Sequence, residues 1–74
     1  MTLPAEDMPA TFTTTELAMI RLICGQYFDT EIAQELSVSV QAVRAMRKVI
    51  MKKMKVKEPV GIVIYAVKNS IYEV

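Results

Sequence analysis

The sequence predicts an all-α domain of four helices, and three observations support this. Apolar residues recur at three- and four-residue intervals through most of the chain, which is the spacing of one helix face. Helix-start signals precede these runs: a threonine three residues before a glutamate, a serine, and a proline. Hydrophobic residues make up 53% of the 74 residues, so the chain can form a single small domain and is not disordered except at its ends.

The composition also narrows the classes of function. The chain has no histidine and one cysteine, Cys24, which lies in an apolar run and is expected to be a buried, reduced thiol. A zinc site is therefore not expected, and a chain without internal disulfides fits a reducing cytoplasm. No nucleophile–base pair or metal constellation is visible, so we predict no catalysis, no cofactor and no metal. The longest apolar run, residues 60–67, is far shorter than the ~20 residues of a membrane span.

Residues 1–11 are expected to form a flexible leader or the remnant of a linker, and residues 12–74 the folded domain. Two of the three prolines, Pro4 and Pro9, lie in this first segment, which has no apolar periodicity. The start of the chain lacks the charged and apolar parts of a secretory signal.

The first helix is predicted over Thr14–Cys24. Thr13 followed by Glu16 forms a capping box, in which the hydroxyl and the carboxylate each accept from the other residue's amide. Gly25 is expected to end the helix. The inward face is expected to carry Leu17, Ile20, Ile23 and Cys24.

A short connection is expected before the second helix. Asp29 or Thr30 is expected to cap that helix. Thr30 and the amides beside it can also hold a DNA phosphate, and both interpretations stay open. Tyr27 and Phe28 are expected to pack in the core or at its rim, because stacking of exposed bases calls for several aromatics on one sheet face.

The centre of the chain predicts a helix-turn-helix. Residues 32–36 continue the second helix, residues 37–39 break it, and a long third helix follows over Val40–Met54 with Ser39 as its N-cap. The inward face of the third helix is expected to carry Val43, Met46, Ile50 and Met54. Arg47 lies close to this face, so its stem is expected to pack while its head reaches solvent.

A stripe of mostly polar residues is expected on the outward side of this third helix. It consists of Gln41, Arg44, Ala45, Lys48 and Lys52. Of the nine basic residues, only Arg21 and Lys68 lie outside residues 44–57, and that span contains no acid. A solvated helix face is the ordinary explanation of such a stripe. Its place on the second helix of a helix-turn-helix favours DNA recognition instead.

Residues 60–74 are ambiguous between a strand and a fourth helix. β-Branched and aromatic residues favour a strand, whereas the length and the apolar recurrence favour a helix. A lone strand has no partner here, so we predict a helix with Pro59 in its first turn and Glu58 beside its positive end. This helix has more apolar residues than the core can bury, which favours a contact between two copies of the chain over core packing alone. The expected contact residues are Val60, Ile64, Val67 and Ile71.

Together, these segments resemble the LuxR/FixJ-type helix-turn-helix domain, the DNA-binding output domain of many bacterial regulators and response regulators. The family's opening Leu-Thr-x-x-Glu is similar to residues 12–16, and its Ile-Ala before the second helix resembles residues 23–24. Its Glu-Ile-Ala-x-x-Leu matches residues 31–36, and its Ile-Ser-x-x-Thr-Val-Lys resembles residues 38–44. Its Lys-Leu/Met-x-Val ending matches residues 53–56. The order and spacing, without gaps, make the resemblance fairly specific.

The resemblance implies four helices, with the third in the major groove and the fourth in dimer contact. The family's DNA-contacting lysine corresponds to Arg44, and Ala45 and Lys48 occupy the other base-reading positions. The chain departs from the family pattern at six positions. Gln26 stands where Gly is usual, and Phe28 where Ser or Thr is usual. On the third helix, Ala42 replaces Thr, Met46 replaces His and Val49 replaces Asn. Arg47 stands where the family usually has an apolar residue.

We therefore expect a bacterial transcription regulator, or its output domain, that binds specific double-stranded DNA in the cytoplasm. The expected DNA contacts are Thr30, Ser39, Gln41, Arg44, Ala45, Lys48 and Lys52. Lys53 and Lys55 are expected to hold the phosphate backbone beside them. A homodimer through the fourth helix is expected, and RNA polymerase is a further candidate partner. The alternatives are a helix-turn-helix that has become a protein-interaction module, and a basic amphipathic helix on an anionic membrane.

Overall fold

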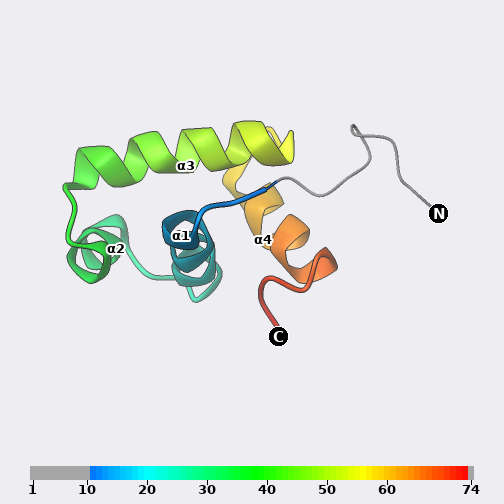
Figure 1. The fold of residues 1–74 in the computed structure, drawn as a ribbon, viewed down its shortest axis with the longest axis horizontal. Helices are drawn as coiled ribbons and strands as arrows, with labels where there is room; N and C mark the ends of the chain where they lie inside the picture. The colour runs from blue at the N-terminus through cyan, green and yellow to red at the C-terminus, as the bar shows by residue number, and fades with distance from the viewer. Residues whose placement is uncertain (1–10, 74) are drawn as a thin grey trace.

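Four helices follow one another in the computed structural model, which describes residues 11–73. They are α1 (Thr14–Cys24), α2 (Asp29–Leu36), α3 (Val40–Met54) and α4 (Pro59–Lys68), and no strand occurs among those residues. Figure 1 shows α3 along one edge of the molecule, with α2, α1 and α4 side by side beneath it. The predicted all-α class is confirmed. Except for Thr11, the predicted leader lies outside the described residues.

The first helix begins and ends where the sequence predicts. The Glu16 amide donates to Thr13 Oγ1 at 3.1 Å, and the Thr13 amide donates to Glu16 Oε1 at 2.8 Å, which completes the capping box. Gly25 follows the helix as predicted, but it keeps an ordinary negative φ of −77°. Gln26 makes the left-handed turn instead, with φ 65°. A side chain on Gly25 would crowd Tyr27, whose ring carbon lies 3.1 Å from the position of a Cβ.

The cap of α2 differs from the prediction. Phe28, not Asp29 or Thr30, is the N-cap, and its amide donates to Glu31 Oε1 at 2.8 Å. The expectation that Asp29 or Thr30 caps this helix is therefore wrong, because the glutamate satisfies the free amide. Phe28 is 75% exposed, so its predicted packing in the core or at its rim is also wrong. At the N-cap it lies before the first turn of α2 and outside that helix's packed face.

The helix-turn-helix of α2 and α3 is confirmed. Ser37 takes a left-handed conformation with φ 56°, and the Val38 amide donates back to the Ala33 carbonyl at 2.9 Å, which closes the end of α2. The Ser39 hydroxyl then accepts from the Ala42 amide at 3.0 Å and starts α3 as predicted.

The ambiguous last segment is a helix, as predicted, although it is shorter than residues 60–74. Pro59 occupies the first turn of α4, and the helix ends at Lys68. The amides of Ile71 and Tyr72 both donate to the Ala66 carbonyl, at 2.8 and 3.2 Å, so the chain folds back at this point. Ile71 is half-buried against the core. It therefore lies apart from the exposed face of α4, with which the sequence analysis grouped it.

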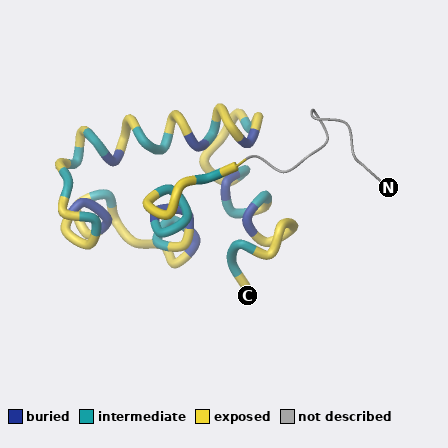
Figure 2. Tube along the Cα trace, in the orientation of Figure 1, coloured by how far each residue is buried: buried dark blue, intermediate teal, exposed yellow. Residues whose placement is uncertain are grey.

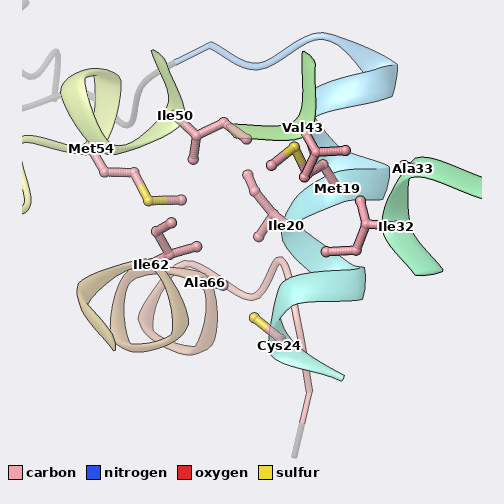
Figure 3. Close-up of a cluster of buried hydrophobic side chains, with 10 residues drawn as sticks. All are labelled: Met19, Ile20, Cys24, Ile32, Ala33, Val43, Ile50, Met54, Ile62 and Ala66. Atoms are coloured by element: carbon pink, nitrogen blue, oxygen red, sulfur yellow. The ribbon is translucent and has the colours of Figure 1, made fainter. Parts of the chain in front are cut away.

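The core lies where the four helices meet. Six large side chains, contributed by all four helices, are fully buried. They are Met19, Ile20, Ile32, Val43, Ile50 and Ile62, and they converge in Figure 3. Burying each contributes about 1.5–3 kcal/mol. Met19 was not among the predicted inward residues, and Cys24 is buried as predicted, with burial raising the pKa of its thiol.

Candidate nucleic-acid interface

The outward stripe predicted on α3 is exposed along its length. Gln41, Arg44, Ala45, Lys48 and Lys52 are all exposed, and Figure 2 shows the exposed turns on the side of α3 that faces away from the other helices. We call this set the α3 ridge. Burial of Val43, Ile50 and Met54 fixes the rotation of the helix, so the ridge residues must face outward. An apolar face that is buried in the core is also not free for the membrane alternative.

Two further residues predicted to contact DNA lie beside the α3 ridge. Thr30 is in the first turn of α2 and is exposed, and because Phe28 caps this helix, the Thr30 hydroxyl is not used as the cap. Ser39 is exposed, and its hydroxyl oxygen accepts from the Ala42 amide. A hydroxyl that accepts one hydrogen bond still has a proton to donate. Both side chains can therefore donate to a phosphate oxygen.

Asp29 holds one of the α3 arginines against α2. Arg47 Nη1 donates to Asp29 Oδ2 at 3.2 Å, and Arg47 Nη2 donates to Asp29 Oδ1. The prediction that the head of Arg47 reaches solvent is wrong. The head is paired with a carboxylate, and the side chain is only 21% exposed. These hydrogen bonds, and to a smaller extent the charge of Arg44, hold the pKa of Asp29 below its ordinary value.

A second α3 cation, Lys53, is also engaged by the protein itself. Lys53 Nζ donates to Glu16 Oε1 at 2.7 Å and lies 5.7 Å from the centre of the Phe12 ring. The Phe12 ring in turn meets Tyr65 edge to face at 6.1 Å. Lys53 therefore joins α3 to the start of α1 and is not the free backbone contact predicted from the sequence. Lys55 is exposed and stays available.

Replacing Lys53 with methionine should destabilise the protein more at neutral pH than in acid. The hydrogen bond from Lys53, followed by that from the Thr13 amide, lowers the pKa of Glu16 below its ordinary 4.5. A carboxylate with a lowered folded-state pKa stabilises the fold above its unfolded pKa, and this stabilisation is lost as the pH falls through the folded value. We expect Lys53→Met to cost about 0.2–1 kcal/mol at pH 7 and less at pH 3.

Urea unfolding at the two pH values measures this difference. Lys57→Met is the matched control, because Lys57 is exposed and lies outside any helix. An equal loss of stability at both pH values for Lys53→Met would contradict a role for the Glu16 charge.

Asp29 and Glu16 were not predicted to be partners of α3. Both pairs join residues far apart in the chain, Asp29 with Arg47 and Glu16 with Lys53. One signal did exist: an arginine near the apolar face of a helix calls for a carboxylate opposite it. Nothing local identified which acid that is.

Three of the four α3 positions that depart from the family resemblance lie on one flank, whereas the fourth, Arg47, contacts Asp29 of α2. Ala42 and Met46 are half-buried, and Val49 is 48% exposed. This flank therefore presents apolar side chains. It lies beside the α3 ridge and does not interrupt it.

The outer face of α4 is apolar and uncovered. Val60 is 62% exposed, Ile64 51% and Val67 38%. We call these three residues the α4 patch. The short helix α4 therefore leaves apolar surface in solvent, from these three residues and from Pro59, that is not buried in the core.

Residues 11–73 present neither a cluster of metal ligands nor a membrane-spanning helix. No three His, Cys, Asp or Glu residues there are grouped so that they can hold a metal ion. None of the helices combines the length and the apolar character that crossing a membrane requires.

Comparison with known proteins identifies the family. The family model GerE, described as bacterial regulatory proteins, luxR family, matches residues 10–66. No curated protein and no solved structure matches the chain. The matched span contains α1, α2, α3 and most of α4, including the whole α3 ridge. With the four-helix fold and the helix-turn-helix of α2 and α3 already established, the chain belongs to the luxR family of bacterial regulatory proteins.

Proposed function

We propose that this protein is a bacterial transcription regulator, or the output domain of one, that binds specific sites in double-stranded DNA through α3. The α3 ridge is the observation that supports this most directly. Its three cations, Arg44, Lys48 and Lys52, are exposed, with Arg44 Nε 3.9 Å from Asp29 Oδ2. The other cations of α3, Arg47 and Lys53, form closer pairs with acids of the same chain. Family membership supports the same function.

The proposed contacts follow from the chemistry of the α3 ridge. A helix about 10–12 Å across fits the major groove, which is about 12 Å wide. Arg44 and Lys48 contact guanine edges or phosphates, Gln41 reads adenine, and Ala45 meets a thymine methyl. Lys52, Thr30 and Ser39 bind the phosphate backbone and fix the register.

Titration of labelled duplex DNA at several salt concentrations tests the proposal. A site is first selected from a random pool, and its affinity is compared with that of random duplex by fluorescence anisotropy. We expect tighter binding to the selected site than to random duplex. We also expect a plot of log affinity against log salt concentration to have a slope of about −0.9 for each phosphate contact. Absence of binding to any duplex at low salt would exclude this function.

We also propose that the α4 patch pairs two copies of the protein. Paired recognition helices match the two half-sites of a palindromic operator. Ile64→Lys should weaken self-association at least about tenfold, because a lysine in a small apolar contact must lose its hydration. Sedimentation equilibrium measures the dimer constant.

The control for that substitution is Gln34→Lys, which adds the same charge on an exposed position of α2. We expect it to leave the dimer constant unchanged. If both variants associate like the parent protein, the α4 patch is not the dimer contact.

A protein-interaction module is the second candidate function. The α4 patch and exposed Val49 favour it, because both present apolar side chains to solvent. Such a module dimerises or binds another protein without affinity for duplex DNA. Self-association in the sedimentation experiment together with no shift of random duplex at low salt would select this candidate.

A further inference from the structure

The first turn of α2 places a carboxylate beside two arginines of α3. Asp29 Oδ2 accepts from Arg47 Nη1 at 3.2 Å and lies 3.9 Å from Arg44 Nε. The two arginines differ in what they leave free. The Arg47 side chain is 21% exposed, whereas that of Arg44 is 67% exposed. Asp29 therefore sequesters one guanidinium and touches only the edge of the other.

The contact between Asp29 and Arg44 is made through the Nε edge of the guanidinium. A guanidinium carries five N–H donors in a flat fork. With the Nε edge turned towards Asp29, the terminal nitrogens remain for another partner. Two such nitrogens are the donors of the bidentate arginine contact with O6 and N7 of guanine. At 3.9 Å, Asp29 steers Arg44 by charge and does not hold it through a hydrogen bond.

The same carboxylate opposes binding of the phosphate backbone at this point. The start of a helix attracts anions through its free amides. At α2 the Asp29 charge lies in this place, and like charges repel. Arg47, which would otherwise attract a phosphate, is already paired with Asp29. In a complex with DNA, Asp29 would thus lower the part of the affinity that does not depend on base sequence.

We infer that Asp29 is a positioning residue, which directs Arg44 towards base edges and keeps Arg47 off the phosphate backbone, and so raises preference for a specific site. The inference rests on the proposed DNA-binding function. It also accounts for the pairing of Arg47, whose largely buried side chain has its own counter-charge in Asp29.

Asp29→Asn is the variant that tests the inference, because it keeps the shape of the side chain and removes its charge. We expect random duplex to bind more tightly, with a salt slope steeper by about one unit, because one more arginine reaches a phosphate. We expect the ratio of specific to random affinity to fall roughly fivefold or more, the lower end of what one bidentate arginine contributes.

Glu35→Gln is the matched control, because it removes the same charge from an exposed position at the other end of α2. If it changes slope and ratio as much as Asp29→Asn does, net charge explains the effect and the inference is wrong. Asp29→Glu, the conservative variant, should restore most of the parent ratio. The parent protein is titrated alongside each variant. If the parent binds no duplex, the proposed DNA-binding function is wrong, and not only the role of Asp29.

A second variant separates a loss of folding from a loss of positioning. Asp29→Asn with Arg47→Gln removes both charges of the pair, so no arginine is left without a partner. We expect this variant to keep the parent's salt slope, within error, and still to lose site preference, because Arg44 is no longer steered. A parent-like ratio would overturn the inference. Circular dichroism confirms that each variant is folded before it is titrated.

Discussion

Replacing Arg44 and Lys48 together with alanine should abolish the preference for a selected DNA site. Both side chains are exposed on the α3 ridge, and Arg44 has 67% of its side chain in solvent. Each well-placed contact with a base is worth about 1–3 kcal/mol of discrimination, so losing two should weaken specific binding by at least roughly 30-fold. Neither residue packs in the core, so the fold should persist. Anisotropy titration against the selected site and against random duplex measures the change.

The matched control for this variant is Arg21→Ala with Lys68→Ala. It removes one arginine and one lysine as well, from exposed positions on α1 and α4. We expect the control to weaken specific and random binding alike, through net charge alone, and to keep their ratio. A double variant at Arg44 and Lys48 with the parent's ratio would show that α3 does not read the DNA sequence.

Replacing Gly61 with alanine should destabilise the protein, even though alanine is the better helix former. The Cβ of an alanine at this position would lie 2.6 Å from Val56 Cβ, where the segment before α4 passes across the helix. Overpacking of this kind costs about 1–3 kcal/mol or more, and the gain in helix propensity is at most roughly 1 kcal/mol. We expect net destabilisation, measured as a lower midpoint in urea unfolding.

Two further variants test whether the contact with Val56 is the cause. Val56→Gly removes the opposing Cβ, so combined with Gly61→Ala it should cost less than the sum of the two single changes. Gly25→Ala is the control, because its nearest contact would be the movable Tyr27 ring at 3.1 Å. If the Gly61→Ala protein is as stable as the parent, residues 55–58 can shift to make room for the added Cβ without loss of unfolding free energy.

Local signals allowed much of the fold to be predicted from the sequence. α1 and α3 begin and end at the predicted residues, because Thr13, Glu16 and Ser39 satisfy amides within their own first turns. The cap of α2 was mispredicted for a related reason. Asp29 and Thr30 are both good caps, but Glu31 already accepts from the free Phe28 amide, so the helix begins one step earlier with an unusual residue.

The parts of the site that the sequence did not reveal depend on contacts between distant residues. Helical periodicity places the ridge residues on one face, and the structure confirms their exposure. Periodicity cannot tell which cations are already neutralised, because Arg47 and Lys53 find their acids on other helices. The end of α4 escaped prediction similarly, since the chain reverses at Ser70, a non-glycine residue with φ 58°.

The engagement of Lys53 has a mechanical consequence. Its ammonium donates to Glu16 and also to the Thr11 carbonyl, the latter at 3.4 Å. The segment that precedes α1 is therefore bound directly to the C-terminal end of α3. A displacement of the chain at Thr11 or Phe12 would therefore disturb contacts of α3 as well as the start of α1.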